Sequence, residues 1–461
     1  MLKLFVLPSA RMDRFSTEER VSPARPDANV FLKDVLVRVS VIALLFLSTI
    51  SFADDRVLTE GDGWKWYRGN MHTHSLWSDG DDYPEMIGHW YRDHRYDFLV
   101  YTDHNILHQS DKWVDIEKNK GGLKAFEKLK EKFPGDWIQT REKDGRQEVR
   151  LKKFDEVFDR LAIPQKFLLI QGEEITDRFQ NRPVHLCATN TLDLLPPLHG
   201  ESVAEVIQNN INAAVSHRER TGQKTLVHLN HPNFGYGVTA EDLMKVVGEN
   251  FFEIYNGHPS VNNSGDETHA STERMWDIIN TWRLAKLDLP LMYGLATDDG
   301  HSYFEKTPGK ASQPGRGWVM VLAETLTPDA IVTSLEAGRF YSSSGVHLQH
   351  VSSTEKTLSV QVAGNAEATY TIEFIGTLRD FSDQTSPAVD DPEKAAAITR
   401  RYSEDVGKLL QSSQGTEATY TFRGDELYVR AVITSSVKHP NPSEAGDFQQ
   451  AWTQPVIPPS R

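Results

Sequence analysis

Histidines and carboxylates recur in closely spaced pairs along the first two thirds of the chain. The first pair is His72 and His74 in "HTH", and Asp79 follows five residues later. Side chains at positions i and i+2 of a strand point to the same side, so one cation could take both imidazoles. One such pair alone is more typical of a protein surface. The chemistry therefore depends on whether the rest of the chain supplies further ligands.

Further residues that could bind a metal stand at or just after the apolar runs of the sequence. They are Asp103 and His104 in "TDHN", Glu173 and Glu174 in "GEEIT", His185 in "RPVHLCA", His231 in "NHP", and Asp299 and His301 in "DDGH". Functional side chains collect at the carboxyl ends of strands in parallel α/β barrels. Histidines scattered over a protein surface would not recur at the ends of apolar runs. The pattern therefore predicts a site for more than one metal ion.

The elements that would carry these residues are short buried strands that alternate with helices. We expect strands over 96–105, 166–174, 224–232, 251–257 and 290–299, and helices over 202–222 and 272–288. Alternation of this length, from about residue 64 to 345, is typical of a parallel α/β domain. The spacing alone leaves open whether the sheet is a barrel or doubly wound.

The pattern changes beyond residue 346. Segments such as 357–364 and 426–436 alternate polar and apolar residues at period two, which predicts a small antiparallel β-sandwich. The intervening stretch 391–411 is predicted to form a single helix. These C-terminal strands carry no group of histidines and carboxylates, so we expect them to pack against the first domain or to recognise a partner rather than to carry chemistry.

Composition restricts the partners and the kind of metal site. The 461 residues include 65 Asp and Glu against 50 Lys and Arg. This acidic balance argues against a nucleic acid as the main partner, because phosphate backbones need a basic face. Cys187 is the only cysteine, so neither an intramolecular disulfide nor a thiolate zinc cluster can form. Histidine with carboxylate suits zinc, manganese or iron better than magnesium or calcium.

Residues 1–53 have the order of features of a secretory signal peptide preceded by a polar lead. Lys33 and Arg38 precede the apolar run 41–50, and small residues lead up to Ala53. The run is shorter than the roughly 20 residues that cross a bilayer. We therefore expect a secreted or periplasmic protein cleaved after Ala53, with no stable membrane span; an uncleaved anchor is the alternative.

The order of the motifs resembles the polymerase-and-histidinol-phosphatase (PHP) superfamily over residues 66–345. The resemblance implies a distorted (β/α)7 barrel at 54–345, followed by the β-domain at 346–461. It also implies two or three metal ions at the strand ends and hydrolysis of phosphoesters. The metal ligands it implies are His72, His74, Asp79, His104, Glu174, His185, His231, Asp299 and His301. Glu174 matches the bridging carboxylate because an aliphatic residue follows it, and Glu173 would then be a neighbour.

The resemblance also suggests catalytic roles. Asp299 would orient the ions, and Asp103 would hold His104 in its ligating tautomer. His301 could protonate the leaving group as well as bind metal. Asn256 and Arg182 are the candidates for substrate contact, with Arg316 and Arg339 as further arginines that could hold a phosphate.

Other histidines and one aspartate have less defined roles. His228 precedes His231 by three strand positions, so it should face the opposite side and pack in the core. His108, His258 and His269 either line the mouth of the site or are solvated. Asp298 is expected to shape its loop or to support the neighbouring ligand.

Three functions remain open from the sequence. A metal-dependent phosphoesterase acting on a phosphorylated small molecule or polymer fits the motifs best. An amidohydrolase-like enzyme also begins with His-x-His, but its bridging lysine has no counterpart at the expected strand ends. The third alternative is an exported binding protein in which the metals are structural.

Overall fold

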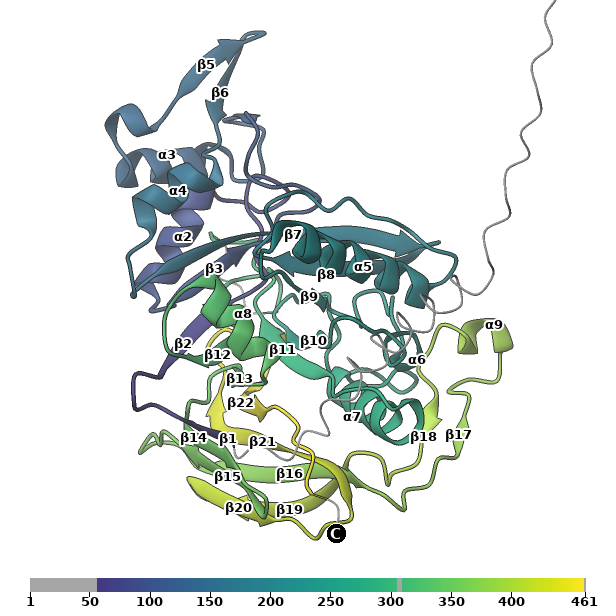
Figure 1. The fold of residues 1–461 in the computed structure, drawn as a ribbon. Helices are drawn as coiled ribbons and strands as arrows, with labels where there is room; N and C mark the ends of the chain where they lie inside the picture. Colours follow the sequence, from purple (N-terminus) through teal and green to yellow (C-terminus); the bar gives the residue numbers. More distant parts are fainter. Residues whose placement is uncertain (1–55, 305–308, 460–461) are drawn as a thin grey trace, which may run out of the picture. The chain divides into compact units, whose positions relative to one another are not determined.

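The computed structural model describes residues 56–304 and 309–459, all within one compact unit, Ala53–Arg461. Figure 1 shows their fold. The predicted signal peptide lies outside the described residues. Within these ranges, none of the helices combines the length and the hydropathy that a membrane crossing requires.

A 13-stranded mixed sheet dominates the fold, and its first seven strands position the candidate site. Their order is β11-β10-β9-β8-β7-β3-β2. The strands are β2 (Lys65–Asn70), β3 (Phe98–Tyr101), β7 (Leu168–Phe179), β8 (Arg182–Thr189), β9 (Leu226–Leu229), β10 (Phe251–Asn256) and β11 (Tyr293–Thr297). All five strands expected from apolar runs in this region are present, with β7 longer than predicted.

The predicted (β/α)7 barrel is not confirmed; the described residues form a mixed α/β protein with large sheets. Strands β2, β3 and β7 are parallel, as are β9, β10 and β11, but β8 is antiparallel to β7 and β9. Only two residues separate β7 from β8, and a connection that short permits an antiparallel pair alone. The sheet also continues from β2 into β12 (Trp318–Ala323). An isolated parallel bridge between Thr73 and Gly300 joins the segments that follow β2 and β11.

The helices of this region begin and end where local signals require. Helix α5 (Val203–Thr221) begins at Ser202, whose Oγ accepts the amide of Glu205, and ends at Gly222 with φ 71°. Helix α7 (Thr272–Trp282) begins at Ser271 in the same way and continues as the short π-helix η2 (Arg283–Leu287). Both confirm the helices expected at 202–222 and 272–288. The other α-helices described between residues 56 and 340 are α2 (Pro84–Asp93), α3 (Gly122–Lys132), α4 (Phe154–Leu161), α6 (Ala240–Leu243) and α8 (Pro328–Glu336).

A small three-stranded sheet lies in the segment between β3 and β7. It consists of β4 (Trp113–Asp115), β5 (Thr140–Lys143) and β6 (Arg146–Arg150), with the 3-10 turn η1 (Gly135–Trp137) before β5. Helices α2, α3 and α4 lie together beside it (Figure 1).

The C-terminal strands form the predicted antiparallel pairs but extend the large sheet as well. A four-stranded antiparallel sheet has the order β1-β14-β15-β20, formed by β1 (Arg56–Thr59), β14 (Leu348–Ser353), β15 (Thr357–Val362) and β20 (Glu417–Thr421). The large sheet passes through β13 (Phe340–Ser343) into β22 (Phe448–Thr453), β21 (Glu426–Lys438), β16 (Tyr370–Leu378) and β19 (Lys408–Gln414). Apolar residues of both sheets share one core cluster that includes Leu358 and Ile433.

The helix predicted over 391–411 is wrong. Helix α9 covers only Pro392–Ala395, and the short strands β17 (Thr385–Ser386) and β18 (Arg401–Tyr402) pair nearby before β19 begins. The guanidinium of Arg274, on α7, donates hydrogen bonds to three backbone carbonyls of this stretch, those of Tyr402, Ser403 and Val406. In a helix these carbonyls would instead accept hydrogen bonds from backbone amides of the same helix. Tertiary contacts therefore override the local helical pattern here.

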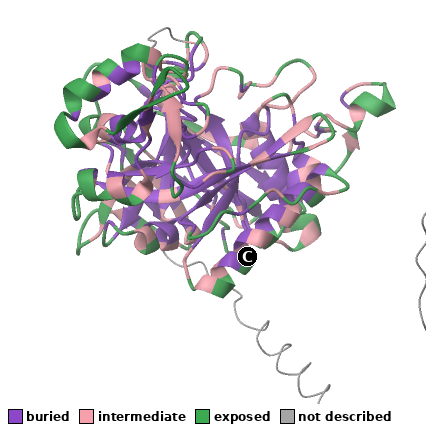
Figure 2. Cartoon of the chain, turned by 90° about the horizontal axis from the view of Figure 1, so that it is seen from above, coloured by how far each residue is buried: buried purple, intermediate pink, exposed green. Residues whose placement is uncertain are grey.

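Burial follows the layers of the fold. Figure 2 shows buried strands at the centre and exposed residues mainly on helices and loops. Side chains of β3 are buried on both faces, and so are those of β9 and β10. Polar side chains near the ends of these strands are consequently removed from water along with their apolar neighbours.

Candidate metal centre

His72 and His74 follow β2 and are completely buried. Their Nε2 atoms lie only 3.1 Å apart. The extended backbone between them is fixed because the amide of His74 donates to the carbonyl of Gly300 at 2.9 Å. Two imidazole nitrogens at this distance need either a shared proton or a cation between their lone pairs. The two imidazoles therefore point to the same side and approach each other, as their i, i+2 spacing predicted.

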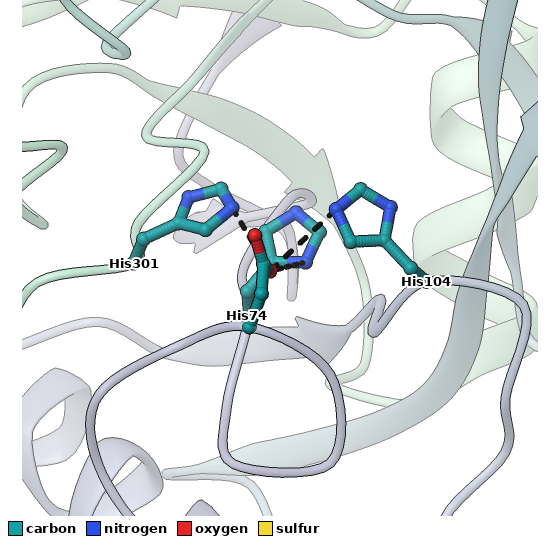
Figure 3. Close-up of side chains that lie close together, drawn as sticks. His74, His104 and His301 are labelled. Carbon is teal, nitrogen blue, oxygen red and sulfur yellow. Dashed lines mark ion pairs between the residues drawn. The ribbon is translucent and has the colours of Figure 1, made fainter. Parts of the chain in front are cut away.

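Four residues form what we call the outer group: His74, Asp79, His104 and His301. Each offers one ligand atom, and these atoms all lie within 4.8 Å of one another. Asp79 Oδ1 is 3.2 Å from His301 Nε2 and 3.5 Å from His104 Nε2. Figure 3 shows His301 and His104 approaching His74 from opposite sides. The Asp79 side chain is 51% exposed, so this group lies at the solvent side of the centre.

Two further groups, the inner groups, are buried more deeply. One contains His72, Glu174 and His231, and the other His72, His74 and Asp299. Because His72 belongs to both and His74 also belongs to the outer group, the three groups are contiguous. His185 is the one predicted ligand outside these groups, but its Nδ1 lies 3.1 Å from Glu174 Oε1.

Glu174 is the carboxylate that the predicted ligands share. Five histidines lie within 2.8 to 3.5 Å of its oxygens: His72, His74, His104, His185 and His231. Nevertheless, Glu174 Oε2 and Asp299 Oδ1 are buried without a hydrogen bond of good geometry to any described residue. A buried carboxylate oxygen ordinarily has a partner. Other buried carboxylate oxygens, such as Glu173 Oε2, also lack a hydrogen bond. Glu174 Oε2 and Asp299 Oδ1 differ because each also faces at least two imidazole rings, and this arrangement fits a bound cation.

The electrostatics of the cluster also suit a cation. Burial by itself raises the pKa of Glu174, but the facing His104 and His72 hold it well below its usual range. Burial likewise raises the pKa of Asp299, which His72 and His301 lower by more. Burial, His301 and His104 together lower the pKa of His74 to about 4, so its ring is neutral at pH 7 and able to bind metal.

Neighbouring groups orient two of the histidine ligands. His301 Nδ1 donates to the carbonyl of Asp299 at 2.8 Å, and His72 Nδ1 lies 2.7 Å from Glu253 Oε1. A histidine whose Nδ1–H is held in this way presents Nε2 to a metal. In both residues Nε2 indeed faces the other predicted ligands.

Glu253 was missed by the sequence analysis although it connects several ligands. Its Oε1 also accepts from Thr297 Oγ1 at 2.8 Å, and its Oε2 accepts from the amide of His231 at 2.7 Å. Asn256 Nδ2 donates both to Glu253 Oε2 at 2.8 Å and to Asp299 Oδ2 at 3.2 Å. The available signal was a glutamate inside the otherwise apolar run "FFEIYNG".

Asp103 does not support His104 as predicted. It accepts hydrogen bonds from the amide of Ser75 at 2.8 Å, from Ser78 Oγ at 2.5 Å and from His108 Nε2 at 2.6 Å. Consecutive side chains of an extended chain point to opposite sides, so Asp103 and His104 diverge. Ser78 Oγ lies 3.3 Å from His74 Nδ1, so Asp103 acts on His74 through Ser78.

The candidate arginines bind other parts of the protein. Arg182 donates to Asp242 and to the carbonyl of Gly237, both at 2.8 Å. Arg316 is completely buried, with Nη1 2.7 Å from the carbonyl of Gly257. Arg339 lies over the ring of Trp64. None of these guanidinium groups contacts the outer or inner groups within the described residues.

The remaining histidines divide between the interior, the edge of the site and the surface. His228 is buried with Nε2 3.5 Å from Glu253 Oε1, in the layer behind the ligands. The ring of His258 lies 5.4 Å from that of His301, at the edge of the centre. His269 pairs with Asp266 and stacks on Tyr236.

Two acidic neighbours of the predicted ligands serve the fold. Asp298 accepts the amide of Arg316 at 2.6 Å and the hydroxyl of Tyr91 at 2.9 Å, which fixes the loop before Asp299. Glu173 points away from the histidines and accepts the amide of Leu195 at 2.6 Å. Burial raises the pKa of Glu173 to about 8, in contrast to that of Glu174.

No protein-family model and no curated protein matches the chain. Among solved structures, it is similar to a two-domain protein from Bacteroides vulgatus that contains a predicted PHP-like metal-dependent phosphoesterase (15% identity, TM-score 0.37, 87% of this chain and 98% of that one). It is also similar to PsfC from Pseudomonas syringae (13%, 0.30, 59% and 88%). A third is a candidate metal-dependent phosphoesterase from Bifidobacterium adolescentis (14%, 0.28, 58% and 95%).

The centre brings together residues of motifs that are far apart in the sequence. These motifs converge in three contiguous groups of possible metal ligands. The family resemblance expected from these motifs stays a prediction, which the ligand groups fit.

Proposed function

We propose that this protein is a metal-dependent hydrolase that cleaves phosphoester bonds. The observation that carries the proposal is the position of Glu174, which lies against five histidines with one oxygen lacking a hydrogen bond. A carboxylate placed between neighbouring cations offsets their repulsion. All nine residues that the motif comparison proposed as ligands are members of the three groups or contact Glu174.

Two or three divalent ions would be held by imidazole and carboxylate, a ligand set that favours zinc, manganese or iron. Such ions act as Lewis acids on a phosphoryl group and lower the pKa of water. Glu174 and Asp299 supply negative charge in the buried part of the centre. His74 supplies a neutral nitrogen between the inner and outer groups.

The substrate would approach from the outer group. Asp79 and His104 are the exposed members there, with side chains 51% and 28% exposed, whereas His72 is completely buried. His301 lies at this face with its Nδ1–H fixed on the carbonyl of Asp299 and its Nε2 3.2 Å from Asp79 Oδ1. This Nε2 either binds an ion of the outer group or, when it carries a proton instead, delivers that proton to the leaving group, but it cannot do both at once.

The proposed division of the chain places the chemistry in residues 54–345, folded as a distorted barrel, and a supporting or recognition role in residues 346–461. The substrate would be a phosphorylated small molecule or polymer outside the cytoplasm, reached by export through residues 1–53. N-terminal sequencing of the native protein should then begin near Asp54; an intact Met1 start would contradict export.

The amidohydrolase alternative is less well supported. That class commonly bridges its metals with a carboxylated lysine, whereas the shared position here belongs to Glu174.

The decisive experiment combines metal analysis with substrate profiling of residues 54–461. We expect two or three bound transition-metal ions and hydrolysis of phosphomonoesters or phosphodiesters that a chelator abolishes. Hydrolysis of amides instead would support the amidohydrolase alternative. Bound metal without hydrolysis of any substrate in the panel would support a structural role.

A further inference from the structure

Phe234 packs against histidines of the centre instead of the hydrophobic core. Its ring lies 5.1 Å from that of His231, 6.1 Å from His185 and 6.2 Å from His258, measured between centroids. It is only partly buried and belongs to none of the hydrophobic clusters of the described residues. An aromatic ring usually gains its stability from core burial. This ring therefore keeps surface for a ligand beside the metal centre.

The backbone under Phe234 is held in place. Its amide donates to the carbonyl of His231 at 2.8 Å, and its carbonyl accepts the amide of Gly237 at 3.1 Å. An isolated antiparallel bridge joins it to Val261. A ring on such a fixed segment is preorganised, so a ligand that stacks on it need not order the loop first.

His258 supplies a fixed hydrogen-bond donor at the same edge. Its Nδ1 accepts the amide of Ser260 at 3.0 Å, and its own amide donates to Asn256 Oδ1 at 2.8 Å. Since Nδ1 acts as an acceptor, the proton of the neutral ring is on Nε2. No described residue accepts a hydrogen bond from Nε2. The ring adjoins both His301 and Phe234.

We propose that Phe234 and His258 form a substrate subsite: a planar aromatic ring of the substrate stacks on Phe234, and His258 Nε2–H donates to an oxygen of the attached phosphoryl group. The inference rests on the proposed function, because the metal ligands would hold the phosphoryl group. It adds the class of substrate, a phosphoester whose organic part carries a flat ring.

A flat ring fits this surface better than an alkyl group does. Phe234 is partly buried, contacts imidazole rings and belongs to no apolar cluster of the described residues that would enclose a chain with it. Stacking needs only one aromatic face, and where bases stack on aromatic side chains it tightens binding by about tenfold. We therefore expect recognition by shape of the ring rather than by burial of apolar volume.

The test measures binding of phosphonates, which are not hydrolysed, to the metal-loaded protein by calorimetry. Phenylphosphonate should bind about tenfold more tightly than methylphosphonate, and more tightly than cyclohexylphosphonate, which is apolar but not flat. Phe234→Ala should abolish this preference, and Phe234→Tyr should keep it. Phe381→Ala, which changes a partly buried ring packed on Trp282, is the matched control and should keep it too.

His258 has a separate signature in the same titrations. His258→Ala should weaken all three phosphonates by about tenfold, since it removes one hydrogen bond to a charged group. His258→Gln should largely restore binding, because its amide nitrogen can occupy the place of Nε2. His89→Ala, on α2, is the control that should change nothing.

The outcomes separate this inference from the proposed function. If the metal-loaded wild-type protein binds none of the phosphonates, the proposed function is overturned and the subsite with it. If it binds all three equally, or if Phe234→Ala keeps the preference for the phenyl group, the subsite is overturned while the proposed function stands. Metal content, measured for every variant, should remain at the wild-type level.

Discussion

Two regions of the molecule bury charge in different ways. At the metal centre, Glu174 Oε2 and Asp299 Oδ1 have no hydrogen bond within the described residues. Where β21 meets α7, Arg430 is equally buried, but its Nε and Nη2 bind both oxygens of Asp277 at 2.9 and 2.8 Å. Tyr428 adds a third donor to Asp277 at 2.8 Å.

The comparison shows how a structural ion pair differs from a ligand site. The Arg430–Asp277 pair is complete, so it needs nothing from outside the chain. The metal centre instead collects carboxylates and imidazoles whose free atoms face one another. A buried carboxylate oxygen that lacks a hydrogen bond and also faces several imidazole nitrogens, rather than buried charge itself, is what points to a bound cation.

Breaking the complete pair should have the largest effect on stability. Arg430→Ala leaves Asp277 buried without its cation, and such losses cost about 3–5 kcal/mol. Urea denaturation should show this loss, while the folded fraction keeps its metal content. If Arg430→Ala has the free energy of unfolding of the wild-type protein, water has replaced the guanidinium as the partner of Asp277. A variant that folds but loses its metals would show that the two regions are coupled.

Removing the shared charge of the centre should have the largest effect on metal binding. Glu174→Gln keeps the shape but removes the charge, and affinity should fall by at least about 10–100-fold, the loss typical of changes behind the ligands. Turnover should fall with it. Glu173→Gln, the adjacent control, should do much less. If Glu173→Gln loses metal and Glu174→Gln does not, the assignment is reversed; if neither matters, the metal centre is refuted.

Glu253 tests whether orientation of the ligands matters as well as their charge. Every partner of its oxygens is a donor, so the amide of Glu253→Gln would place a donor against a donor. We expect about a tenfold loss of affinity at the inner groups. The outer group contains neither His72 nor His231 and should keep its ion. Metal titration followed by mass spectrometry should show that some of the bound ions are lost and others remain. Loss of all ions, or of none, would contradict this prediction.

Ser78 should give the smallest of these effects. Ser78→Ala removes the link between Asp103 and His74 Nδ1 but leaves every predicted ligand in place. We expect a loss of a few fold in metal affinity, comparable to one neutral hydrogen bond of about 1 kcal/mol. Ser359→Ala, on β15, is the control and should have no effect on metal. An effect as large as that of Glu174→Gln would mean that Ser78 itself is a ligand.

Much of the fold could be predicted from local patterns. Apolar runs located β3, β7, β9, β10 and β11, and the helical spacing of apolar residues located α5 and α7. Local patterns failed at 391–411, where contacts of Arg274 from another part of the chain decide the backbone. Local patterns also did not predict the antiparallel direction of β8. That direction follows from the two-residue connection between β7 and β8, and the apolar pattern does not reveal such a connection.

The sequence by itself determined which residues can bind metal and the order in which they occur. Motifs at the ends of apolar runs are local features, and the resemblance to the PHP motifs favoured Glu174 over Glu173 because an aliphatic residue follows Glu174. The predicted ligands could therefore be named before any contact was known.

Only the tertiary structure decided how those ligands are oriented. Glu253 holds His72 across 181 residues, and Asp103 serves His74 through Ser78 rather than its neighbour His104. Such partners are set by which strand ends meet in space and by the direction of each side chain there. Hydrogen bonds depend on distance and angle, and neither can be read from spacing along the chain.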